Sequence, residues 1–120
     1  MPHNPAMVEK MKRKIRQRVD CRFPTGEGDK SGILEDRAII MSNPGTAGVP
    51  YWDVVDQIRF AGEPELWMRI GYYRQVGEEL RWGSQTTLME PMTVWKRLFV
   101  EAAKQKPWFR DLLEEAVREL

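Results

Sequence analysis

Residues 66–88 read LWMRIGYYRQVGEELRWGSQTTL and contain the clearest local signal in this chain. Apolar side chains alternate with others through residues 66–74, and a similar alternation returns in residues 79–88, which is typical of two β-strands. Gly77 suits the left-handed backbone conformation that a tight hairpin loop requires. We therefore expect a β-hairpin with strands at about 66–74 and 79–88, joined by a three-residue loop at residues 75–77.

The alternation also assigns the hairpin side chains to two faces. The expected loop places Arg74 opposite Glu78, so that Trp82 lies opposite Ile70. The inner face then comprises Leu66, Met68, Ile70, Tyr72, Leu80, Trp82 and Leu88. The outer face presents Trp67, Arg69, Tyr73, Arg81 and Gln85, together with two glycines.

Helical periodicity predicts the elements around this hairpin. Apolar residues recur at helical spacing through residues 6–19, which predicts an N-terminal helix, and again through residues 51–61, which predicts a middle helix. A short apolar run, AIIM, predicts an edge strand near residues 37–41. Two amphipathic stretches separated by Pro107 predict two C-terminal helices. The expected fold is α+β, a small antiparallel sheet with elements in the order α-β-α-β-β-α-α.

Length and composition favour one domain. The 120 residues are 42% hydrophobic and include 5 Trp, 4 Phe and 3 Tyr, which is enough apolar surface for a core without metals or disulfides. We expect a single domain over residues 1–120, with a loose N-terminus at residues 1–5 and a flexible loop at residues 22–32. No apolar run approaches the roughly 20 residues that a membrane helix needs, and a single cysteine, Cys21, cannot form an internal disulfide. We therefore expect a cytoplasmic protein without membrane contact.

The charges are unevenly distributed, although the net charge is only +1. Residues 1–22 contain seven basic and two acidic side chains, a balance of +5, whereas residues 23–65 contain three basic and eight acidic ones, a balance of −5. The two blocks can pair with each other, or the basic block can meet an acidic partner. The candidate contact residues in the basic block are Lys10, Lys12, Arg13, Lys14, Arg16 and Arg18.

These features suggest a binding or adaptor domain with nucleic acid as its leading partner class. Aromatic and guanidinium groups on an open sheet face can stack on unpaired bases, and a basic helix can contact phosphates. The outer-face candidates are Trp67, Arg69, Tyr73, Arg81 and Gln85. The alternative is that the N-terminal helix or a second copy of the chain covers this face. A protein–protein module that acts as a homodimer is therefore the second hypothesis.

The residues available for catalysis are few. The only histidine, His3, lies in the expected loose terminus, so it offers no credible base or metal ligand. Neighbouring arginines favour the thiolate of Cys21, but no histidine base accompanies it. Asp53 and Asp56 share a face only if their segment is helical. A small metal-dependent enzyme that uses Asp and Glu alone is the third hypothesis, and we expect no catalytic residue, metal ligand or cofactor.

Overall fold

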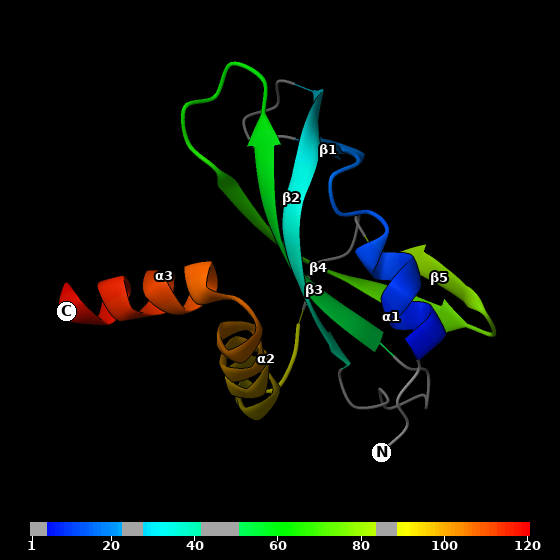
Figure 1. The fold of residues 1–120 in the computed structure, drawn as a ribbon. Helices are drawn as coiled ribbons and strands as arrows, with labels where there is room; N and C mark the ends of the chain where they lie inside the picture. Colours follow the sequence, from blue (N-terminus) through cyan, green and yellow to red (C-terminus); the bar gives the residue numbers. More distant parts are fainter. Residues whose placement is uncertain (1–4, 23–27, 42–50, 84–88) are drawn as a thin grey trace. The chain divides into compact units, whose positions relative to one another are not determined.

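The computed structural model describes residues 5–22, 28–41, 51–83 and 89–120. Its elements are α1 (Pro5–Lys12), β1 (Arg18–Arg22), β2 (Asp29–Met41), β3 (Tyr51–Phe60), β4 (Trp67–Val76), β5 (Glu79–Trp82), α2 (Met92–Gln105) and α3 (Pro107–Arg118). The five strands form one antiparallel sheet in the order β1-β2-β3-β4-β5, so each strand pairs with its neighbour in the chain (Figure 1). The predicted α+β class is therefore confirmed.

Strand β3 replaces the middle helix expected for residues 51–61, so that prediction is wrong. β3 is the third of the five strands, and among its ten residues only Arg59 is exposed. A strand buried on both faces lacks the alternation of polar and apolar residues, so its apolar positions can match a helical spacing by coincidence. The β-branched residues Val54, Val55 and Ile58 were the signal in favour of a strand.

Helix α1 is shorter than the helix expected for residues 6–19. It ends at Lys12, and Arg16 has a φ of 74°, a left-handed conformation that is uncommon for a non-glycine residue. The backbone N–H of Arg16 donates to the carbonyl oxygen of Leu34 on β2 at 2.6 Å. Because this hydrogen bond joins a neighbouring strand, the chain leaves the helical path and continues into β1.

Strand β2 is longer than the strand expected near residues 37–41, and it is an inner strand rather than an edge. It begins at Asp29, within the stretch 22–32 that was expected to be a loop. Residues 23–27 of that stretch, and residues 1–4 of the expected loose terminus, lie outside the described residues. Its partner β1 has the sequence RVDCR, which contains no apolar run, so the apolar pattern did not reveal this pair.

The hairpin of β4 and β5 is confirmed, but its register differs from the expected one. Val76 pairs with Glu79, which leaves a two-residue turn in place of the three-residue loop. Gly77 opens this turn with a φ of 62°, as a type II′ turn requires. The shorter turn places Trp82 opposite Tyr73 rather than Ile70. Leu80 and Trp82 are still the less exposed residues of β5, and Arg81 is exposed, as expected. Gln85 and Leu88, from the rest of the expected second strand, lie outside the described residues.

The faces of the first part of β4 are the reverse of those expected. Leu66 and Met68 are 42% and 44% exposed, whereas Trp67 packs edge-to-face on Phe60 with a ring centroid distance of 5.9 Å. The stretch LWMR has a large apolar or amphipathic side chain at every position, so the alternation alone did not decide which face is buried. Burial of the larger indole ring accounts for the observed choice.

The strands run through two compact units, which we describe separately. The first consists of Met1–Arg37 and Val55–Ile70, and the second of Ala38–Val54 and Gly71–Leu120. The core of the first unit is the cluster Leu34, Ile58 and Phe60, with Ile15, Val19, Cys21 and Trp67 packed against it. In the second unit Phe109 is buried and contacts the rings of Phe99 and Trp108 edge-to-face. That residues 1–120 form a single domain stays a prediction.

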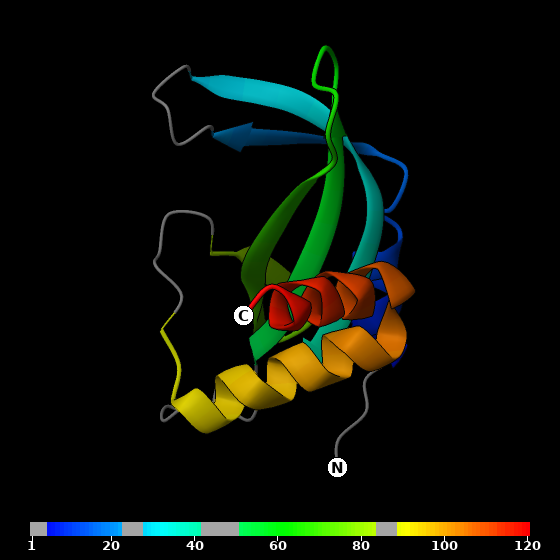
Figure 2. The same ribbon diagram turned by 90° about the vertical axis from the view of Figure 1, so that its left-hand side faces the viewer.

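Helices α2 and α3 confirm the predicted C-terminal helix pair. Figure 2 shows α2 and α3 as two separate helices. Extended backbone at Lys106 separates them, and Pro107 occupies the first turn of α3, where its missing N–H costs nothing. Gln105 ties the end of α2 to β2, because its amide donates to the carbonyl of Ile39 at 2.7 Å and accepts from the N–H of Ile39 at 2.9 Å. None of the described helices has the length and apolar character needed to cross a bilayer.

Gly71 lies against the indole ring of Trp82, and this contact gives a direct test of the observed hairpin register. A Cβ atom at position 71 would overlap three atoms of that ring. We expect Gly71→Ala to lower the free energy of unfolding by about 1–3 kcal/mol, the usual cost of overpacking. In a Trp82→Ala background the same substitution should cost less than about 0.5 kcal/mol. Urea unfolding of all four proteins measures both costs, and equal values in the two backgrounds would contradict the register.

Candidate functional site

The six basic candidates near the N-terminus have exposed side chains and lie within residues 10–18, which we call the basic segment. Lys10 and Lys12 belong to the last turn of α1, where the helix dipole favours positive side chains. Arg13, Lys14 and Arg16 follow in the turn that leads to β1, and Arg18 begins that strand. The structure therefore places the six residues on successive elements of one continuous surface segment.

Buried side chains and backbone hydrogen bonds hold the basic segment in position. Met7 and Met11 bury one side of α1, and the carbonyl oxygen of Met11 accepts a hydrogen bond from Nη1 of Arg37 at 3.2 Å. After the helix, Gln17 accepts a hydrogen bond through its carbonyl oxygen from the N–H of Leu34 at 3.0 Å. The backbone is thus fixed on β2 at both ends of the segment, while the basic side chains face solvent.

Acidic residues neutralise part of the basic segment. The guanidinium of Arg18 lies 3.3 Å from the carboxylate of Asp20, and that of Arg16 lies 3.9 Å from Glu35. A hydrogen bond from Ser31, reinforced by the charge of Arg18, lowers the pKa of Asp20 below its usual value. All of these groups except Glu35 are well exposed, so each pair is worth little. Arg16 and Glu35 thus join the basic block to the acidic block, as one alternative from the sequence expected, whereas Arg18 and Asp20 both belong to the basic block.

Lys12, Arg13 and Lys14 differ from Arg16 and Arg18 in the charges that surround them. Within the described residues, no ion pair involves Lys12, Arg13 or Lys14, and all three are exposed. They are consecutive along the end of α1 and the following turn, so their charges repel one another unless an external anion lies near them. This part of the basic segment is therefore available to an acidic partner.

The hairpin candidates do not share one open face. Trp67 packs on Phe60 in the core of the first unit. The side chain of Arg69 is 26% exposed, and its guanidinium forms an ion pair at 2.9 Å with the buried carboxylate of Asp56. The expectation that Trp67 and Arg69 belong to an outer face is therefore wrong, because both side chains contribute to the interior of the first unit.

The other three hairpin candidates fall in the second unit or outside the described residues. Tyr73 packs edge-to-face on Trp82, with a centroid distance of 5.0 Å. Arg81 is exposed and lies 3.4 Å from the carboxylate of Glu79. Gln85 lies outside the described residues. The structure therefore gives no continuous aromatic and guanidinium platform among the residues that it describes.

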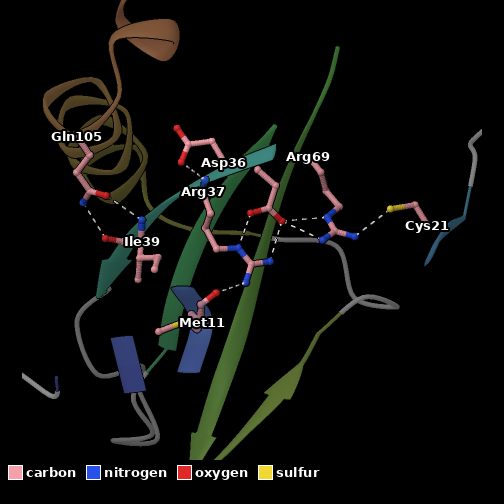
Figure 3. A network of polar contacts seen from close by, with 8 residues as sticks. Met11, Cys21, Asp36, Arg37, Ile39, Arg69 and Gln105 are labelled. Atoms are coloured by element: carbon pink, nitrogen blue, oxygen red, sulfur yellow. Dashed lines mark hydrogen bonds and ion pairs between the residues drawn. The ribbon is translucent and has the colours of Figure 1, made fainter. Parts of the chain in front are cut away.

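Arg69 belongs to a buried polar network centred on Asp56 (Figure 3). Arg37 binds this carboxylate with two hydrogen bonds, from Nε to Oδ1 at 2.6 Å and from Nη2 to Oδ2 at 3.0 Å. Arg69 donates from Nη2 to Oδ2 at 2.9 Å and from Nη1 to the sulfur of Cys21 at 3.2 Å. With the bond from Arg37 to Met11, the network joins α1 and the first four strands.

The contacts of this network compensate the burial of its charged groups. The side chains of Asp56 and Arg37 are 0% and 1% exposed, and the carboxylate has a cation on each side, so its burial is compensated. Burial raises the pKa of the Cys21 thiol, and this effect exceeds the opposing influence of Arg69. The thiolate that neighbouring arginines were expected to favour is therefore disfavoured, and Cys21 acts as a weak hydrogen-bond acceptor.

Asp53 is a second buried carboxyl group, and it belongs to the second unit. It is 2% exposed, and its Oδ1 atom has no hydrogen-bond partner among the described residues. Burial, followed by the charge of Glu90, raises the pKa of Asp53 to about 6, against the opposing effect of Arg97. Asp53 and Asp56 lie three positions apart on a strand and therefore point to opposite sides of it, so they do not form the pair expected on a helix.

Asp and Glu do not gather into a metal centre in the part of the chain that the structure covers: no group of three or more metal-ligating side chains is found there. Comparisons with protein families, with curated proteins and with solved structures found no match. The candidate site is therefore defined by geometry and charge, and it is the basic segment.

Proposed function

We propose that this chain is a binding domain for a polyanion, with single-stranded nucleic acid as its leading partner class, and that the basic segment is the contact surface. The observation that supports this proposal is the group Lys12, Arg13 and Lys14. These side chains are exposed, consecutive and not paired within the described residues, on a backbone that hydrogen bonds fix to β2. No residue has a catalytic role in this proposal.

Binding at this surface is driven by the release of counterions from the phosphate backbone. Each phosphate neutralised on a single strand contributes roughly −0.7 to the slope of log K against log salt concentration. Arg16 and Arg18 contribute less, because Glu35 and Asp20 already lie beside them. Contacts of this kind position a nucleic acid without reading its bases, so the expected sequence preference is weak.

Replacing Lys12, Arg13 and Lys14 together by alanine tests the proposal. We expect at least a tenfold loss of affinity for a labelled mixed-sequence 20-nucleotide single strand at low salt, because three phosphate contacts are lost. The slope of log K against log salt should become less steep by about 2. Fluorescence anisotropy titrations at several salt concentrations measure both quantities.

A matched control distinguishes the loss of local phosphate contacts from a general effect of net charge on the affinity. Lys96, Lys104 and Arg110, on α2 and α3, also comprise two lysines and one arginine. Their joint replacement by alanine changes the net charge equally and should leave the affinity within about twofold of that of the unmodified chain, since these residues lie outside the proposed contact. Two results would overturn the proposal: no detectable binding of the unmodified chain at low salt, or equal losses in the two triple variants.

A further inference from the structure

Helices α2 and α3 enclose an apolar groove with a basic rim. The floor is formed by Phe99, Val100, Ala103 and Leu113, and the rim by Lys96, Lys104 and Arg110. The groove has a volume of about 380 Å³, which is room for several apolar side chains, and Val100 remains 43% exposed in its floor. An apolar floor between cations fits an apolar stripe that has carboxylates beside it.

Helix α3 carries such a stripe. Ala116, Val117 and Leu120 follow Leu113 at intervals of three, four and seven residues, so they share one side of the helix. Val117 is 67% exposed, and Leu120 is fully exposed just beyond the helix end. In Figure 1 this end of α3 extends away from α2. The acidic residues of this segment are Asp111, Glu114, Glu115 and Glu119.

We propose that the groove receives α3 of a second copy of this chain, in a dimer with two-fold symmetry. The two helices have complementary charges. Residues 92–106 contain four basic side chains and one acidic, a balance of +3, whereas residues 107–120 contain two basic and four acidic, a balance of −2. A symmetric interface requires that each copy presents both halves of every contact, and a chain with this groove and this stripe does so.

The second copy is favoured over an unrelated partner because one contact covers two exposed apolar surfaces at once. In the symmetric arrangement, the stripe of each α3 leaves solvent and each groove is filled. Glu114 and Glu119 flank the stripe on its two sides, because at about 100° per residue each lies roughly 60° around the helix from a stripe residue. From there they can approach Lys96 and Lys104 of the facing groove. Because the contact involves little more than a helix pair, the dimer should be weak, with a Kd on the order of 10–100 µM. This inference does not depend on the proposed binding of nucleic acid.

Charge exchange across the interface provides the test. We expect sedimentation velocity of the full chain, between 5 and about 500 µM, to show a mass that rises from monomer to dimer with concentration. The variant with Lys96→Glu and Lys104→Glu should remain monomeric, and so should the variant with Glu114→Lys and Glu119→Lys. In a dimer of either variant with itself, the groove of one copy would face a stripe whose flanking charges have the same sign. An equimolar mixture of the two variants should form a dimer, since both contacts of the mixed pair again join opposite charges.

Controls keep the test decisive. The pair Lys12→Glu and Lys14→Glu makes the same charge change on the basic segment, and it should leave the dimer intact while weakening nucleic-acid binding. Circular dichroism melting of each variant verifies folding, and Val117→Ser, on the exposed stripe, gives a second route to a monomer without a charge change. A chain that stays monomeric at about 500 µM, or a mixture that fails to dimerise, would overturn the proposal.

Discussion

Asp56→Asn is expected to lower the free energy of unfolding by about 3–5 kcal/mol. The carboxylate of Asp56 balances two guanidinium groups, and that of Arg37 is 1% exposed, so its removal leaves a buried cation without a counter-charge. Asparagine keeps the size of the side chain, and the loss therefore reports charge rather than a cavity. Urea unfolding at pH 7, monitored by tryptophan fluorescence, measures the change, with the m-value compared between the variants.

Asp20→Asn is the matched control, because it removes the same charge from an ion pair with arginine that is exposed to solvent. Asp20 lies 3.3 Å from Arg18, but both side chains are more than half exposed. The expected cost of Asp20→Asn is small, because solvent screens an exposed ion pair and the pair contributes little to stability. A loss in Asp56→Asn no greater than that in Asp20→Asn would show that the buried network does not stabilise the first unit.

The parts of the fold that follow from local rules could be predicted from the sequence. Gly77 between two alternating stretches indicated the hairpin, and Pro107 indicated the break between the two C-terminal helices. The register of the hairpin could not be predicted in this way. A two-residue turn and a three-residue loop differ only in where pairing begins, and the burial of Trp67 and Arg69, which sequence spacing does not reveal, decides the face.

For the site residues too, some features could be predicted from the sequence and others could not. Exposure of the basic segment could be expected, because consecutive lysines and arginines are rarely buried. The pairing of Asp56 with Arg37 was missed, since the apolar residues around Asp56 matched a helical spacing and suggested a surface position for it. A usable signal did exist. A single carboxylate within a run of buried residues requires a cation on a neighbouring strand, and Arg37 directly precedes the apolar run of β2.

Asp53→Asn should have the opposite effect to Asp56→Asn at neutral pH, because this carboxyl group is buried without such compensation. Its pKa in the folded chain is about 6, compared with an ordinary value of 3.8, so the folded state holds the proton more tightly than the unfolded chain does. The contribution of protonated Asp53 to stability is fully present below pH 3.8 and is lost as the pH rises through 6. The difference corresponds to about 3 kcal/mol.

The measurement compares the free energies of unfolding of Asp53→Asn and the unmodified chain between pH 4 and pH 7. We expect the two to be similar at pH 4, and the variant to be more stable by up to about 3 kcal/mol at pH 7, because asparagine fills the same space without a charge. Taking the difference at each pH cancels the titration of other groups. Glu90→Gln serves as a second probe, since the charge of Glu90 helps to raise the pKa of Asp53. In that variant the pH dependence should move to lower pH, and a difference that does not change between pH 4 and pH 7 would show that Asp53 is not an uncompensated buried charge.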